Sequence, residues 1–207
     1  MTHSFVGFRR YLDQFYQLTD SEFEQFTPDF FLKNIQAKQK LVQEGDIEDN
    51  IYFIAKGILR KYFHRGKEQI VTGFYKENDI CLSVISYFSL KPSTITIETI
   101  EPTICVGIKK SDLEKLMNQL PLAEKIFRGI LSSLYVKKDA EQINNLRYSK
   151  KERFLLLCEK QPDLLQSVPQ KQLASYLEIT PETFCRMKRF RYDQAKEARQ
   201  TAIAYSK

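Results

Sequence analysis

The sequence predicts an α+β protein that begins with an antiparallel, jelly-roll-like β-roll, continues with a long helix and ends with a helix-turn-helix domain. Three observations support this order. Short apolar or alternating runs recur between residues 39 and 109, a long helical pattern runs from 121 to about 146, and two capped helices follow each other within 167–191. We expect the domain boundaries at 1–118, 119–148 and 149–207.

The first domain opens with short helices and continues with strands. Residues 5–35 have a helical pattern that turn residues interrupt near Thr19 and Pro28. The period then changes to short runs separated by turns rich in Gly, Asn and Asp, which is typical of an antiparallel roll. These runs are 40–43, 51–55, 59–64, 69–75, 94–100 and 104–108, and a helical stretch at 84–90 interrupts them.

The second segment is one long helix. After a short helix at 111–118, Pro121 begins a pattern of about 26 residues, or ~39 Å, in which apolar residues recur at steps of three and four. A helix of this length either docks on its own chain or pairs with a second copy of itself, and we favour the second. The expected dimer interface consists of Leu122, Ile126, Ile130, Ser133, Lys137, Ala140 and Ile143.

The third segment has two helix start signals close together. Ser167 is a candidate N-cap, with Pro169 as first helical residue and Gln170 completing a capping box. Thr180 and Pro181 repeat the signal. In the second helix, Phe184, Met187 and either Phe190 or Arg191 lie inward, and the outer face consists of Glu182, Cys185, Arg186 and Arg189. This pattern predicts a helix-turn-helix that presents its second helix to a DNA major groove.

The charge distribution favours the same partner. Residues 147–207 hold 13 Lys and Arg against 7 Asp and Glu, whereas residues 1–146 hold 19 of each. A basic excess confined to one segment is expected where that segment meets phosphates, although a solvated basic tail gives the same count. A DNA reader also uses two half-sites, which favours the dimer.

The DNA contacts expected on this segment are of two kinds. Arg186 is placed to bind guanine bidentately or, as the alternative, to hold a phosphate. Glu182 either accepts a hydrogen bond from cytosine or stabilises the start of its own helix. The remaining cations are expected to position the protein on the DNA backbone. The complete set is Lys171, Thr180, Glu182, Thr183, Cys185, Arg186, Lys188 and Arg189.

Catalysis and metal binding have no support in the sequence. His3 and His64 belong to no constellation, and the four cysteines are far apart, so we expect no enzyme activity, no metal and no cofactor. No apolar run approaches the ~18 residues of a membrane helix, and the first ten residues do not read as a signal peptide. We therefore expect a cytoplasmic protein without a membrane partner.

The order of β-roll, long helix and helix-turn-helix resembles the Crp/Fnr superfamily of transcription regulators. The similarity rests on Glu44-Gly45-Asp46, on residues 51–60, on Glu77-Asn78-Asp79 and on the recognition-helix residues 179–186; Pro92-Ser93 resembles the branch common in Bacteroidetes-type bacteria. The resemblance implies a homodimer that binds double-stranded DNA at a roughly palindromic operator, contacts RNA polymerase and senses a small-molecule effector through its roll.

Departures from the family pattern shape these expectations. The Glu and Arg that hold cyclic AMP in one branch fall on Ser83 and Ser93 here, so we expect no response to cyclic AMP, although Lys91 leaves a phosphate contact open. The candidate effector pocket consists of Ser83, Ser86, Lys91, Ser93 and Thr94, which are equally ordinary in solvated turns.

The recognition segment also departs from the family. Glu178 stands at a turn where the family usually has Gly, which predicts local strain or a different turn. Cys185 replaces a family serine, or else acts as a redox switch. Residues 192–204 read as a helical tail, so we expect little or no wing. These features support an alternative function: a ligand-binding or protein-interaction module that has lost specific DNA binding.

Overall fold

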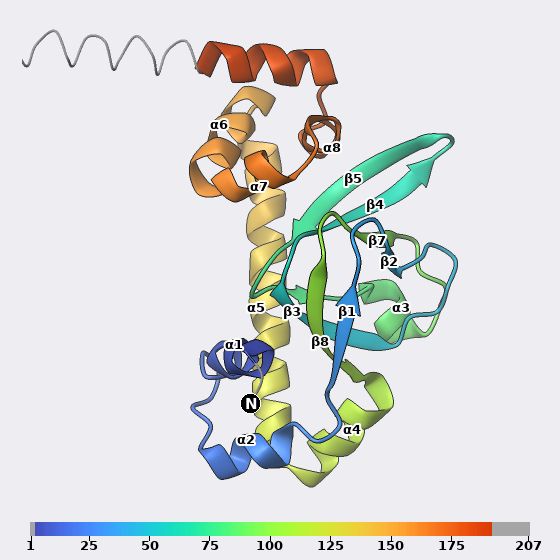
Figure 1. Cartoon of the computed structure of the whole chain (residues 1–207), viewed down its shortest axis with the longest axis vertical. Helices are drawn as coiled ribbons and strands as arrows, with labels where there is room; N and C mark the ends of the chain where they lie inside the picture. Colours follow the sequence, from blue (N-terminus) through green and yellow to red (C-terminus); the bar gives the residue numbers. More distant parts are fainter. Residues whose placement is uncertain (1–2, 192–207) are drawn as a thin grey trace, which may run out of the picture. The chain divides into compact units, whose positions relative to one another are not determined.

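The computed structural model describes residues 3–191, which fall into two compact units (Figure 1). The first unit is Met1–Gln142 and the second is Ile143–Lys207. The helical tail predicted for 192–204 lies outside the described residues. Within the described part of the chain, none of the helices has both the length and the apolar character needed to cross a membrane.

Two short helices open the first unit. They are α1 (His3–Leu12) and α2 (Asp20–Phe26), and α2 starts with a capping box in which the Thr19 side chain accepts from the Glu22 amide. Their buried side chains are mostly aromatic, among them Phe8, Tyr11 and Phe26. The predicted helical pattern extended to residue 35, which is wrong for its last part, because residues 31–35 form a strand instead.

The roll consists of two four-stranded antiparallel sheets, ordered β1-β8-β3-β6 and β2-β7-β4-β5. All six predicted runs contain strands, and the helical stretch at 84–90 is α3 (Val84–Ser89). The strands are β1 (Phe31–Ile35), β2 (Lys40–Val42), β3 (Asn50–Lys56), β4 (Leu59–Arg65), β5 (Glu68–Tyr75), β6 (Ile80–Cys81), β7 (Thr96–Thr99) and β8 (Thr103–Lys109).

Strand β3 is buried on both faces and therefore separates two apolar clusters. Tyr52 and Ile54 point between the sheets, where they meet Leu59, Ile97 and other side chains of the roll interior. Ile51 and Phe53 point the other way, into a second cluster formed with the helices. This double burial explains why β3 has a continuous apolar run rather than an alternating one.

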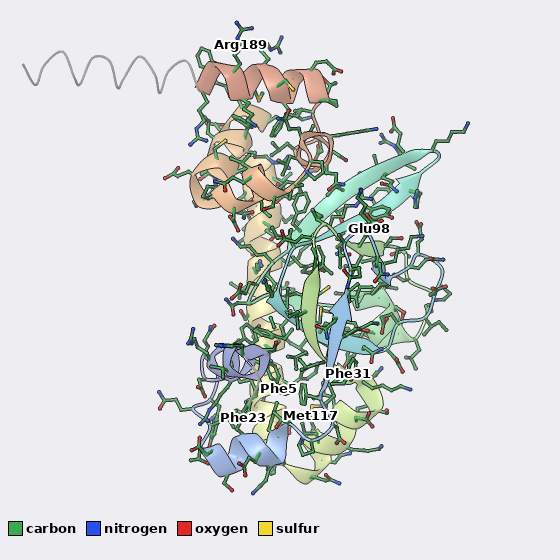
Figure 2. All side chains as sticks on the ribbon, viewed as in Figure 1. Phe5, Phe23, Phe31, Glu98, Met117 and Arg189 are labelled. Atoms are coloured by element: carbon green, nitrogen blue, oxygen red, sulfur yellow. The ribbon has the colours of Figure 1, made fainter. Side chains whose placement is uncertain are left out.

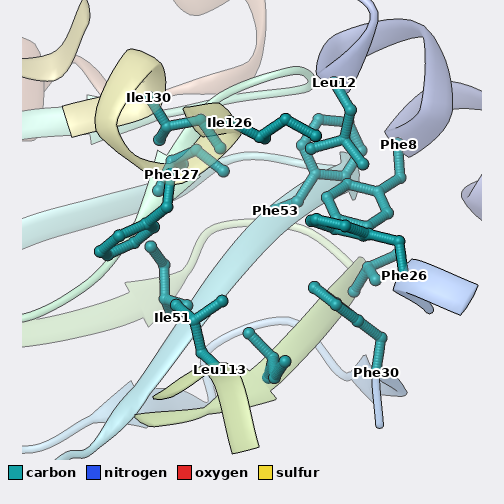
Figure 3. A pocket seen from close by; sticks show the side chains of 13 residues that line it. Phe8, Leu12, Phe26, Phe30, Ile51, Phe53, Leu113, Ile126, Phe127 and Ile130 are labelled. Atoms are coloured by element: carbon teal, nitrogen blue, oxygen red, sulfur yellow. The ribbon is translucent and has the colours of Figure 1, made fainter. Parts of the chain in front are cut away.

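The long helix α5 (Pro121–Arg147) follows α4 (Lys110–Gln119) and docks on the roll of its own chain. Ile126 and Ile130 are buried there, together with Phe53 and the aromatic residues of α1 (Figure 3). Fully burying such a side chain contributes about 1.5–3 kcal/mol. The helix is therefore anchored by the face that carries these two isoleucines.

This anchoring corrects part of the predicted dimer interface. Ile126 and Ile130 lie in the chain's own core, so these two side chains are not available to a second copy, whereas Lys137 pairs with Asp79 at 2.6 Å but stays 54% exposed. A helix that carries apolar residues on two faces does not reveal from its period which face docks. Of the other predicted interface residues, Leu122 is partly buried and Ser133, Ala140 and Ile143 are exposed.

A second apolar stripe on α5 faces solvent. Tyr135, Val136 and Leu146 have 75%, 66% and 84% of their surface exposed, and Ile143 is exposed as well. At about 100° per residue, this stripe is displaced from the predicted one by roughly one residue step around the helix. Exposed apolar side chains that share a helix face indicate an interaction surface.

The second unit is a small helical domain. It contains α6 (Lys150–Lys160), α7 (Pro162–Ser167), α8 (Gln170–Tyr176) and a helix over residues 181–191. Ser149 caps α6 through a capping box with Glu152, which fixes the start of this helix at Lys150. The rings of Phe154 and Phe184 meet edge to face with centroids 5.4 Å apart, and both are fully buried.

Candidate nucleic-acid interface and ligand site

The first helix of the predicted pair, α8, begins one residue later than its start signal suggested. Pro169 occupies the N-cap position with an extended ψ of 135°, and its side chain makes no cap hydrogen bond. Ser167 is the last residue of α7, so the predicted capping role of Ser167 is wrong. Proline still marks the boundary correctly, because its fixed φ suits the residue that precedes a first helical turn.

The turn after α8 ends the helix with a left-handed residue. Glu178 has φ 57°, its N–H donates to the Ser175 carbonyl, and the Ile179 N–H donates to the Ala174 carbonyl. This pair of bonds is the Schellman arrangement, whose left-handed position glycine usually fills. The left-handed conformation of Glu178 agrees with the first of the two expectations, and a non-glycine residue in this conformation costs about 1–2 kcal/mol relative to the right-handed one, so strain at this turn is a prediction that a mutation can test.

Two cations from α6 hold this turn in place. The Lys150 ammonium donates to the Glu178 carbonyl, and the Arg153 guanidinium donates to the Tyr176 carbonyl at 3.3 Å. Arg153 also lies 3.6 Å from the Glu178 carboxylate. These hydrogen bonds give partners to carbonyl groups that the end of a helix otherwise leaves unsatisfied. Sequence reasoning missed both residues because their partners are more than twenty positions away along the chain.

The helix over 181–191 starts at the predicted cap. The Thr183 amide donates to the Thr180 hydroxyl at 3.2 Å, which fixes Thr180 as the N-cap. The Glu182 backbone amide and then the Thr180 side chain lower the pKa of the exposed Glu182 carboxyl. These contacts agree with the second of the two roles expected for Glu182, which is to stabilise the start of its own helix, and the contact with a base stays a prediction.

The two sides of this helix differ as the sequence predicted. Phe184 is buried, Met187 is partly buried, and Arg191 contacts the Cys158 thiol and partly offsets the effect of burial on that thiol's pKa, whereas Phe190 is 52% exposed. Phe190 and Arg191 are thus both exposed, and each contacts α6: the Lys151 ammonium lies 5.4 Å from the Phe190 ring, and Arg191 bonds to Cys158. The outward side carries the predicted DNA contacts: Glu182, Cys185, Arg186 and Arg189 are all exposed.

Figure 2 shows Arg189 on the side of the helix that faces away from α6 and α8. Cys185 donates to the Gln170 side-chain oxygen at 3.2 Å, which places the start of α8 beside the middle of this outward side. Lys171 and Lys188 are exposed as well, while Thr183 is partly covered and bonded to Thr180. Gln170 is a surface residue that sequence reasoning did not include among the contacts.

The candidate effector site is a closed set of hydrogen bonds. Ser83 and Ser93 are buried, and their hydroxyl oxygens lie 2.8 Å apart. The Ser93 hydroxyl donates to the Ile95 carbonyl at 2.7 Å, so Ser83 is the donor within the pair. The two positions predicted from the family pattern thus do come together, but each hydroxyl proton already has an acceptor.

The turn over residues 44–48 closes over the same segment. The Gly45 amide donates to the Ser93 carbonyl, the Ser93 amide donates to the Asp46 carbonyl, and the Glu48 amide donates to the buried Ser86 hydroxyl at 2.7 Å. The Ser86 hydroxyl therefore stabilises this turn by accepting the hydrogen bond from the Glu48 amide. Lys91 and Thr94, the other predicted ligand residues, are exposed and are not brought into the buried set.

Lys61 is a charged residue in the roll that sequence reasoning missed. It lies opposite Ile97 in the β4–β7 pairing and so shares the inner face of its sheet. Burial lowers the pKa of its ammonium, and the nearby charge of Lys138 on α5 lowers it further. The only sign of this residue in the sequence was its position, two residues after Leu59 on a strand face that is otherwise apolar. Within residues 3–191, no three His, Cys, Asp or Glu side chains gather as a metal site would require.

One family model matches part of the first unit. Residues 32–120 match the family model described as cyclic nucleotide-binding domain. This range contains the whole roll except the first residue of β1, together with the Ser83–Ser93 pair and α4. No curated protein sequence matches the chain.

Solved structures extend the likeness to the whole fold. FixK2 from Bradyrhizobium japonicum has a TM-score of 0.67 at 15% identity, covering 80% of this chain and 86% of that one. The c-di-GMP responsive regulator CLP from Xanthomonas campestris has a TM-score of 0.62 at 14% identity, covering 83% and 91%. The catabolite activator protein of Thermus thermophilus has a TM-score of 0.53 at 17% identity, covering 89% and 88%. The chain therefore has the fold of Crp/Fnr-type regulators.

The strained turn provides a stability test. Glu178→Gly should raise the free energy of unfolding by about 0.5–1 kcal/mol, because it removes left-handed strain of about 1–2 kcal/mol and gives up an exposed ion pair worth about 0.2–1 kcal/mol. Glu178→Ala keeps the strain, loses the pair and should be less stable than the wild type. Chemical denaturation of the three proteins measures the order. Equal stabilities for the glycine and alanine variants would show that the turn stores no strain.

Proposed function

We propose that the chain is a homodimeric, sequence-specific DNA-binding transcription regulator of the Crp/Fnr type that does not respond to cyclic AMP. The observation that carries the proposal is the exposed side of the helix over 181–191. Two exposed arginines, Arg186 and Arg189, lie on this side, and the buried Phe184 anchors the opposite side of the helix in its domain. A rigid helix with an outward basic face is what major-groove recognition requires.

We assign different tasks to these side chains from their positions on the helix. Arg186 lies in the middle of the exposed side and has the planar fork that matches guanine O6 and N7. Arg189, one turn further, and Lys171 on α8 lie at positions suited to phosphates on either side of the groove. Glu182 must release its own helix start before it can read a base, so we give it the smaller share of specificity.

Dimerisation follows from the solvent-facing stripe of α5. Val136 and Ile143 are seven residues apart, with Tyr135 and Leu146 beside them, which is the spacing of a two-stranded helical seam. The opposite face is occupied by the roll, so this stripe is the face left for a second copy. A symmetric pair places two reading helices on one DNA and gives a roughly palindromic operator.

The remaining parts of the proposal rest on the resemblance to the Crp/Fnr superfamily. The protein acts in the cytoplasm, where it meets DNA and RNA polymerase, and the Pro92-Ser93 pair favours the Bacteroidetes-type branch. We expect no response to cyclic AMP, because the Ser83–Ser93 pair supplies no cation and no unused hydroxyl proton for a phosphate; the identity of any small-molecule effector is left open.

Mutations distinguish the residues that read DNA bases from those that bind the DNA backbone. On an operator selected from genomic fragments, Arg186→Ala should weaken binding by about 1–3 kcal/mol and change binding to random DNA little. Arg189→Ala and Lys171→Ala should weaken both nearly equally and lower the salt slope by about one per phosphate contact, or two per symmetric dimer. Binding titrations at several salt concentrations measure both effects. Loss of all sequence preference in the wild type would favour the interaction-module alternative.

The dimer seam is tested by placing a charge on it. Val136→Glu should convert the dimer to a monomer in sedimentation. The monomer should still fold, because this side chain is exposed within one chain. Asn145→Glu, on the opposite side of the same helix, is the matched control and should stay dimeric. Ile130→Glu should instead destabilise the fold, since it buries a charge in the core. A dimeric Val136→Glu protein would place the interface elsewhere.

Cyclic AMP should leave the protein unchanged. A ligand at 100 times its Kd adds about 2.7 kcal/mol to the free energy of unfolding, so thermal melting detects binding readily. We expect no shift with cyclic AMP or cyclic GMP at physiological concentrations and no change in operator affinity. A clear rise in the unfolding temperature would mean that the serine pair opens and that Lys91 or backbone amides hold the phosphate.

A further inference from the structure

A cavity of about 30 Å³ lies between α5 and the outer face of the β1-β8-β3-β6 sheet (Figure 3). All 13 side chains that line it are apolar, and they come from α1, α2, β3, β6, β8, α4 and α5 and from the segment before β1. Ile51 and Phe53 enter it from β3, whereas Tyr52 and Ile54 of the same strand face the roll interior. The cavity is therefore on the opposite side of this sheet from the roll interior.

The lining determines what this space accepts. A water molecule in a protein cavity normally makes two to four hydrogen bonds, and side chains of Phe, Ile, Leu and Val offer it none. A charged or hydroxylated ligand would likewise lose its hydration without compensation. An uncharged apolar molecule has no hydrogen bonds with water to give up when it enters, and it gains dispersion contacts with the wall.

One wall of the cavity belongs to the helix that connects the two units. Ile126, Phe127 and Ile130 of α5 face the cavity, and Phe8 and Leu12 of α1 complete the opposite side. Phe30 and Phe127 are only partly buried, so part of the wall is formed by side chains that also reach the surface. An occupant would touch both the roll and α5 and would strengthen the packing between them.

We propose that this cavity is a binding site for a small uncharged apolar molecule of a few non-hydrogen atoms, and that its occupation stabilises α5 on the roll. The site does not depend on the DNA-binding proposal, because it is contained in the first unit and uses none of the residues assigned to DNA. It also differs in chemistry from the polar Ser83–Ser93 set.

Xenon is the direct probe, with the full-length wild-type protein labelled at isoleucine and leucine methyl groups. Under xenon pressure, the NMR signals of Ile51, Leu113 and Ile130 should shift in a saturable way. Ile54 and Ile97 in the roll interior are internal controls and should stay unchanged. Absent or non-saturable shifts, or shifts only at other methyl groups, would mean that the cavity is a packing gap without a ligand.

Benzene tests the same site through its volume. Leu113→Ala enlarges the cavity, so benzene should raise the unfolding temperature of this variant in a concentration-dependent way. Leu41→Ala removes an equally buried leucine from the roll interior and should show no such rise. Phenol should bind Leu113→Ala at least about tenfold more weakly than benzene, because its hydroxyl finds no partner in the wall. Equal rises for both variants would overturn the proposal, and the xenon experiment decides the matter if Leu113→Ala does not fold.

Discussion

The burial of one face of α5 on the chain's own roll is the interaction on which the other features of the first unit depend. Ile126 and Ile130 close the core that α1 and the outer face of the β1-β8-β3-β6 sheet begin. Gly129 makes this close approach possible, since a Cβ there would lie 2.8 Å from the Phe15 ring. Once this face is fixed, the outward direction of Val136 and its neighbours is fixed as well, because both lie on one rigid helix.

Much of this architecture could be predicted from the sequence, for identifiable reasons. Strands flanked by turn residues were found because a two-residue period and a Gly or Asn break are local signals. Strand β6 has only two residues and β1 buries only Ile35, so neither produces a period. The docked face of α5 could not be ranked above the exposed one, because both carry apolar residues and only the surface of the roll distinguishes them.

The same limit applies to the nucleic-acid interface. Thr180 and the outward arginines were found because capping and helical spacing act within one turn of chain. Lys150 and Arg153 were missed because they act on a turn that is close only in the folded domain. Glu178 is an intermediate case. Its unusual turn was predicted from the family pattern, whereas the hydrogen bonds from Lys150 and Arg153 that hold the turn come from another helix. Local chemistry therefore predicted the exposed basic side of the helix over 181–191, and long-range contacts explain why the turn before this helix holds its shape.

The Ser83–Ser93 hydrogen bond has a consequence for the conditions under which the roll keeps its shape. A site built from an arginine and a glutamate weakens as salt rises and changes as the carboxyl titrates. Two hydroxyl groups carry no charge and do not ionise in the physiological pH range, so their bond is indifferent to both. The contact between Ser83, which follows β6, and Ser93 therefore keeps its strength when the pH falls within this range or the ionic strength changes.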